Sequence, residues 1–170
     1  MTGVQTCALP IWQGTASLYI HQPGSALNTI NPKWKTILET ENKRRWNENI
    51  IFSGDMITVK TTTLDALIAK HGVPDMIKID VEGHEKNVLN GLSQPVKFIS
   101  FEVLLPEFLT DALYCLDRLM ALNEATRFNY AVEEKTALAR FISYPDFKKM
   151  LCRLSIPHLE VIAMVETLTE

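Results

Sequence analysis

Residues 77–85, Ile-Lys-Ile-Asp-Val-Glu-Gly-His-Glu, place ionisable side chains on alternate positions of a predicted strand. Side chains two residues apart on a strand share one face, so Lys78, Asp80 and Glu82 are expected to lie together. Such groups are costly to bury unless they pair or meet solvent. At the carboxyl end of a strand in an open α/β sheet, they would border a ligand crevice. The pattern therefore predicts a site that contains Asp80 and Glu82, with Gly83 turning the backbone into the next helix.

The same residues also allow a structural interpretation. Lys78 could pair with a neighbouring carboxylate, and Glu82 could face water or cap the following helix. His84 stands alone at a predicted helix start, where a histidine is often incidental, although imidazole is the easier base near neutral pH. Two carboxylates without a third ligand are no evidence for a metal ion, and no metal site is predicted.

The elements that must position these residues alternate between strand and helix. Strands are predicted from β-branched and aromatic content at residues 16–20, 50–60, 76–81, 97–103, 128–134 and 158–165. Helices are predicted over residues 64–70, capped by Thr62 or Thr63 and stopped at a left-handed Gly72, and over 84–90, 106–120 and 145–154. The span between the first two strands is polar and is expected to be irregular. This alternation predicts an α/β fold with a mainly parallel sheet flanked by helices.

Composition limits the class of protein. The chain has 170 residues, 46% hydrophobic and 22% charged, which suits one domain with a core. The net charge of -3 gives no basic field for nucleic acid or an anionic membrane, and no apolar stretch approaches the roughly 20 residues of a membrane span. Cys7, Cys115 and Cys152 have no metal-ligand or disulfide spacing, so a reducing, cytoplasmic location is expected.

The first eleven residues, Met-Thr-Gly-Val-Gln-Thr-Cys-Ala-Leu-Pro-Ile, have no basic region and do not work as a secretory signal. They resemble the translation of a common sequencing adapter. Residues 1–11 are therefore predicted to be non-native, and the native sequence is expected to begin near Trp12.

A longer motif carries a resemblance to a known family. Residues 59–92 resemble the core of the FkbM-type methyltransferases, with Thr-Leu-Asp at 63–65, Asp-Met-Ile-Lys-Ile-Asp-Val-Glu-Gly-His-Glu at 75–85 and Leu-Asn-Gly at 89–91. The following Phe-Ile-Ser-Phe-Glu-Val resembles the next strand of that family. The resemblance extends over residues 12–165 and is most specific over residues 62–102.

The resemblance implies a Rossmann-like class I methyltransferase that moves a methyl group from S-adenosylmethionine to a hydroxyl of a small molecule or glycan, such as a sugar or a secondary metabolite. Methyl transfer depends on aligning the acceptor and removing its proton. Asp80 is then expected to position the acceptor or contact the charged end of the cofactor. Glu82 or His84 is expected to take the proton, and Lys78 to hold Asp80 from a less accessible place. Glu85 is expected to order its helix.

One departure from the family pattern affects the cofactor. The family begins with a strand and a glycine-rich turn, which a close approach to a nucleotide requires. The seven glycines here never cluster, and stand at positions 3, 14, 24, 54, 72, 83 and 91. No cofactor-binding residue is identifiable. Residues 12–170 are therefore expected to be the C-terminal part of a single methyltransferase domain that lacks its N-terminal cofactor-binding strands and is inactive by itself.

Two other functions fit the sequence less well. The chain could be a non-catalytic Rossmann-like binding module or a degenerate relative whose cofactor site was lost. Carboxylates at alternate strand positions also serve glycoside hydrolysis, but Lys78 occupies the place of an aspartate in the barrel signature that this segment distantly echoes. Such a barrel also needs about 250 residues.

Overall fold

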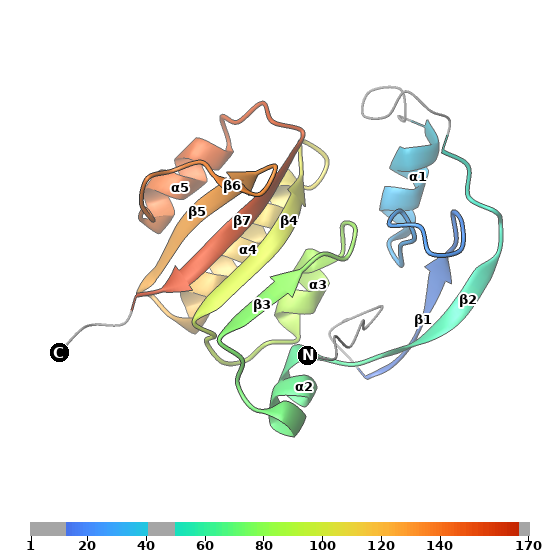
Figure 1. The fold of residues 1–170 in the computed structure, drawn as a ribbon, viewed down its shortest axis with the longest axis horizontal. Helices are drawn as coiled ribbons and strands as arrows, with labels where there is room; N and C mark the ends of the chain where they lie inside the picture. Colours follow the sequence, from blue (N-terminus) through green and yellow to red (C-terminus); the bar gives the residue numbers. More distant parts are fainter. Residues whose placement is uncertain (1–12, 41–49, 167–170) are drawn as a thin grey trace.

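Strands and helices alternate through residues 13–40 and 50–166, which are the residues that the computed structural model describes (Figure 1). The strands are β1 (Gly14–Tyr19), β2 (Met56–Thr61), β3 (Met76–Ile79), β4 (Phe98–Leu104), β5 (Thr126–Val132), β6 (Lys135–Thr136) and β7 (His158–Val165). The helices are α1 (Pro32–Thr40), α2 (Leu64–His71), α3 (Glu85–Asn90), α4 (Leu109–Leu122) and α5 (Tyr144–Leu151). The segment predicted to be non-native, residues 1–11, lies outside the described residues.

The large sheet is mixed, so the prediction of a mainly parallel sheet was wrong. Its order is β3-β4-β7-β5-β6, and β3 and β4 are parallel neighbours. β7 is antiparallel to both β4 and β5, so β4 and β5 run in the same direction. Strand-helix-strand alternation thus correctly gave the direction of β3, β4 and β5. It could not show that β7 would insert between two of them, because the pattern does not specify which strands are neighbours.

The main core lies between this sheet and its helices. α4 covers one face of the sheet (Figure 1) and buries Leu116 and Leu119 in the same cluster as Phe101 of β4. α5 stacks Phe147 on Phe128 of β5, with ring centroids 5.4 Å apart. This layer supports β3 and β4, the two parallel strands whose carboxyl ends carry the acidic residues.

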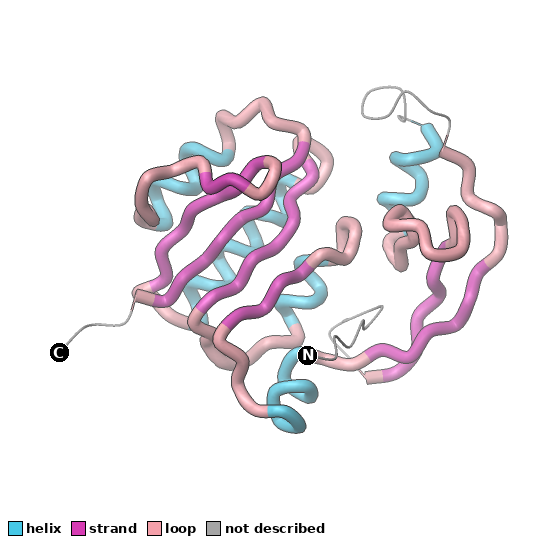
Figure 2. The backbone as a smooth tube through the Cα atoms, viewed as in Figure 1, coloured by secondary structure: helices cyan, strands magenta, loops and turns pink. Residues whose placement is uncertain are grey.

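A second core joins the N-terminal part of the chain to the end of β4. The strands β1 and β2 form a separate antiparallel pair, apart from the five-stranded sheet (Figure 2). Trp34 and Leu38 lie one turn apart on α1 and are fully buried with the apolar residues Ile50, Phe52, Leu104 and Phe108. α1 lies in the span that was predicted to be irregular. The polar residues around Trp34 and Leu38 face outward and hid the helical spacing of this pair.

The ends of the elements agree only in part with the local sequence signals. Thr63 caps α2 as predicted, accepting a hydrogen bond from the Ala66 amide. Gly72 has a positive φ of 87°, but its ψ of 167° lies outside the left-handed helical region that was predicted. The strand predicted over 50–60 forms only as β2, and the helix predicted from Pro106 begins later, at Leu109. Among the described helices, none has the length and apolar character that crossing a membrane requires.

Candidate active site

The acidic residues lie where β3 leaves the sheet. β3 ends at Ile79, two residues earlier than predicted, and Asp80–Gly83 form a turn before α3. Glu82 has a φ of 52°, an unusual value for a residue with a side chain, and Gly83 has a φ of 84°. The turn, and not the alternation of a continuous strand, therefore sets the direction of the Glu82 side chain.

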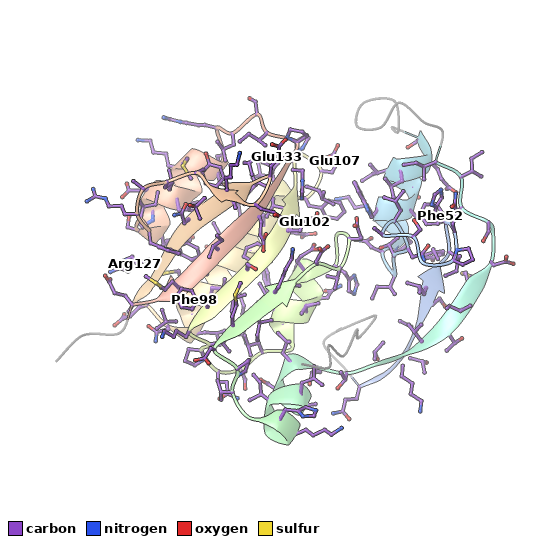
Figure 3. All side chains as sticks on the ribbon, viewed as in Figure 1. Phe52, Phe98, Glu102, Glu107, Arg127 and Glu133 are labelled. Atoms are coloured by element: carbon purple, nitrogen blue, oxygen red, sulfur yellow. The ribbon has the colours of Figure 1, made fainter. Side chains whose placement is uncertain are left out.

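Three carboxylates meet at this end of the sheet. Asp80, Glu82 and Glu102 each offer one oxygen, and these three atoms lie within 4.8 Å of one another. Glu102 belongs to β4 (Figure 3), and it follows Phe101, the register partner of Ile79, so it reaches the same level as Asp80. Glu102 was not predicted as a site residue. The sequence feature that could have indicated Glu102 is a carboxylate inside the apolar run Phe-Ile-Ser-Phe-Glu-Val, at the carboxyl end of the neighbouring strand.

Burial and crowding favour the protonated forms of Glu82 and Glu102. Burial raises the pKa of Glu82 to about 8, and the nearby Glu102 carboxylate adds to the rise. The pKa of Glu102 is raised by burial and then by the charge of Asp80. Three carboxylate oxygens at this spacing could share protons or admit a divalent cation, because either one relieves the repulsion between the crowded negative charges.

His158 sets the orientation of Glu102. Its Nε2 lies 2.7 Å from Glu102 Oε1, and the imidazole is 57% exposed. This contact lowers the pKa of Glu102 and so opposes part of the effect of burial. The second oxygen, Glu102 Oε2, is buried and has no hydrogen-bond partner among the described residues. The cluster therefore contains one buried oxygen whose hydrogen-bonding capacity no described residue uses.

The structure does not bring His84 into this cluster. Its ring contacts Asn87, whose Nδ2 lies 2.9 Å from Nε2, and burial lowers the pKa of the imidazole. Within the described part of the chain, His84 has no hydrogen bond or ion pair with Asp80, Glu82 or Glu102. Its role as a base stays a prediction.

Lys78 contacts the cluster from the edge of the sheet. Its Nζ lies 3.8 Å from Asp80 Oδ2 and 3.9 Å from Glu160 Oε2, so the expected approach to Asp80 is present. The side chain is 58% exposed, not the less accessible partner that was expected. β3 is an edge strand of the large sheet, so its side chains have a neighbouring strand on one side only. Exposed ion pairs of this length contribute little to stability.

Residues of the N-terminal part hold the turn from outside. Trp34 Nε1 donates a hydrogen bond of 2.8 Å to Glu82 Oε2, and Thr29 Oγ1 donates one of 3.1 Å to the Glu82 carbonyl. Asn31 Nδ2 donates to the Gly83 carbonyl. Sequence reasoning missed these residues because it predicted no helix here. The available signal was Asn31-Pro32, since proline favours the first helical position.

Glu85 holds the same turn from inside. It is 7% exposed, and its Oε1 accepts hydrogen bonds from the amides of Val81, at 3.3 Å, and Gly83, at 3.2 Å. Burial raises the pKa of Glu85 to about 7. As expected, Glu85 orders the start of its helix, and its buried position keeps it away from a ligand.

The fold and site define an α/β protein with an acidic cluster at the carboxyl ends of two adjoining parallel strands, which is where such folds bind ligands. Comparison with known protein families matches residues 2–151 to the methyltransferase FkbM domain. The chain belongs to the FkbM methyltransferase family. A search of curated proteins found no match. The family implies a methyltransferase with S-adenosylmethionine as the methyl donor.

The described residues do not fit the nucleotide part of that cofactor. Gly24, Gly54 and Gly72 have positive φ but stand singly, and nothing lies within 4 Å of where a Cβ would be. At Gly83 a Cβ would meet Phe108, 2.6 Å from its Cζ, so a ring already fills that space. Among the described residues there is no glycine-rich turn against which a nucleotide could pack.

Proposed function

We propose that this chain carries the acceptor-activating side of an S-adenosylmethionine-dependent O-methyltransferase whose substrate is a hydroxyl of a sugar or a secondary metabolite. The observation that supports this most directly is Glu82, a carboxyl group with a pKa of about 8 beside two further carboxylates. A base near the operating pH is what removal of a hydroxyl proton requires.

Each residue has a defined part in this proposal. Ionised Glu82 accepts the proton of the acceptor hydroxyl, and its raised pKa makes it a stronger base than an ordinary glutamate. Asp80 accepts a hydrogen bond from a neighbouring hydroxyl and so fixes the orientation of the acceptor. Glu102, held by His158, places a second carboxyl group beside Glu82 and so adds to the rise in the Glu82 pKa.

Two further parts of the proposal concern the chain as a whole. Because the glycines of the printed sequence never cluster, the 170 residues by themselves are proposed to transfer methyl groups poorly or not at all. Cys115 and Cys152 are free thiols, which supports a reducing, cytoplasmic location.

The acceptor side can be tested without methyl transfer. The chain is labelled with ¹³C at the glutamate carboxyl carbons, and the Glu82 signal is assigned as the one lost in Glu82→Gln. We expect a titration midpoint near 8, as the pKa predicts. Methyl α-glucopyranoside, added at pH 8, should shift the Glu82 signal, because its hydroxyls can donate to the carboxylate.

The matched control is the same glucoside with every hydroxyl methylated, which keeps the ring but has no proton to donate. It should leave the Glu82 signal in place. A Glu82 midpoint near the ordinary glutamate value, or equal responses to the two glucosides, would overturn the proposal.

A further inference from the structure

Trp34 connects the N-terminal part of the chain to the acidic cluster. It lies 48 positions before Glu82, is fully buried, and donates its indole N–H to Glu82 Oε2 at 2.8 Å. An indole nitrogen can only donate. The contact therefore always presents a donor to that oxygen, whatever the protonation state of the rest of the cluster.

The indole is itself held in place. Its ring packs edge-on against Phe108, with centroids 5.7 Å apart, and Phe108 in turn lies against Gly83. A Cβ at Gly83 would be 2.6 Å from Phe108 Cζ, so the turn and the ring leave no space between them. Trp34, Phe108 and Gly83 thus form one continuous packing unit, and the indole cannot shift without disturbing the turn.

Glu82 needs such support. Its φ of 52° is a conformation that persists for a residue with a side chain only where the surroundings determine it. Thr29 holds its carbonyl and Trp34 holds one carboxylate oxygen, while Glu85 binds the amides on either side. The other oxygen, Glu82 Oε1, has no hydrogen bond within the described part of the chain.

We propose that Trp34 is a positioning residue of the acceptor site, which fixes Oε2 of Glu82 so that Oε1 is left to meet the acceptor hydroxyl. This inference rests on the proposed role of Glu82. It makes residues 29–34 part of the site, although they belong to neither of the strands that carry the acids. Trp34 touches no reacting atom and acts through the carboxylate that it holds.

The contact is tested by the indole N–H signals of the ¹⁵N-labelled chain, which has three tryptophans. The Trp34 signal is the one lost in Trp34→Phe. In Glu82→Ala the acceptor of this hydrogen bond is gone, so the Trp34 proton signal should move upfield. Glu160→Ala, which removes a different carboxylate near Lys78, is the control and should leave it in place. An unchanged Trp34 signal in Glu82→Ala, or equal changes in both variants, would contradict the inference.

The positioning role is tested by titrating methyl α-glucopyranoside into Trp34→Phe, which keeps an aromatic ring but has no N–H. We expect the affinity for the glucoside to fall several-fold. The control is Tyr144→Phe, which removes another aromatic hydrogen bond to a carboxylate, Asp117, far from the site, and should bind as the wild type does. Wild-type affinity in Trp34→Phe would overturn the inference and leave the proposed function standing. If the Glu82 signal of the wild type does not respond to methyl α-glucopyranoside, the proposed function is overturned. The indole spectra report on the contact between Trp34 and Glu82 in either case.

Discussion

At Glu82, burial and neighbouring negative charge act on one carboxyl group, and both disfavour its ionised form. A glutamate on an open turn would ionise well below neutral pH and would be a weak base. The hydrogen bond from Trp34 acts in the opposite direction and keeps the ionised form accessible. The reactivity proposed for this residue therefore depends on the balance between a buried environment and one donor.

The raised pKa of Glu82 has a consequence for stability. Unfolded Glu82 ionises near 4.5, whereas the folded group keeps its proton up to about pH 8. The contribution of the protonated Glu82 to the free energy of unfolding is fully present below pH 4.5 and is lost as the pH rises to about 8. The free energy of unfolding of the wild type should therefore fall relative to Glu82→Gln, at a limiting rate of about 1.4 kcal/mol per pH unit. Urea unfolding of both proteins between pH 4.5 and 8 measures this difference, and a constant difference would contradict it.

At the residue scale the sequence predicted two of the three carboxylates of the cluster. Asp80 and Glu82 could be found because their charges interrupt an apolar run at a strand end. Glu102 carried the same signal on the next strand, but only the register of β3 with β4 shows that it reaches Asp80. The Asn31-Pro32 signal could have located the helix of Trp34 but not its contact with Glu82, because the two residues are 48 positions apart and no local pattern encodes such a pairing.

At the scale of elements, the turn between β3 and α3 controls the site. Gly83→Ala is expected to destabilise the fold in two ways, through a positive φ, at about 1–2 kcal/mol, and through overlap with Phe108, at about a further 1–3 kcal/mol. Gly24→Ala is the matched control, because Gly24 also has a positive φ but has open space around it. The measurement is urea unfolding, and equal losses in the two variants would show that the Phe108 contact has no cost.

The sequence predicts some helices and strands of this fold better than others, because only some of them have a local pattern. β3, α3 and β4 were found because their apolar runs are local signals, and Gly83 and Gly91 mark the ends of the first two. α1 was missed because two buried residues among polar ones make a weak pattern. The place of β7 was missed because the choice of neighbours in a sheet is decided by tertiary packing and not by the strand's own residues.

At the scale of the whole molecule, the acids and the cofactor impose different requirements. The acidic cluster needs only the ends of β3 and β4 and the turn that Trp34 holds. A nucleotide needs a backbone that it can approach closely, and the printed sequence has no cluster of glycines that would provide one.

We therefore expect no saturable binding when S-adenosylmethionine is titrated into the 170-residue chain in a calorimeter. The Glu82 signal should still respond to the glucoside in the same preparation, which shows that the protein is folded. Saturable binding at micromolar concentrations would mean that this chain holds the cofactor by means other than a glycine-rich turn.

The hydrogen bonds from the N-terminal part of the chain to the turn between β3 and α3 also affect the order in which the protein folds. The hydrogen bonds from Trp34 and Thr29 to Glu82 join residues 48 and 53 positions apart, whereas β3, α3 and β4 follow one another directly along the chain. Closing a long loop costs more conformational entropy than forming local contacts, so distant pairings tend to form after local ones. The carboxylates of Asp80 and Glu102 can thus be brought together by adjoining strands early in folding. We therefore expect Glu82 to gain its final orientation when the N-terminal segment docks, later in folding than the pairing of β3 with β4.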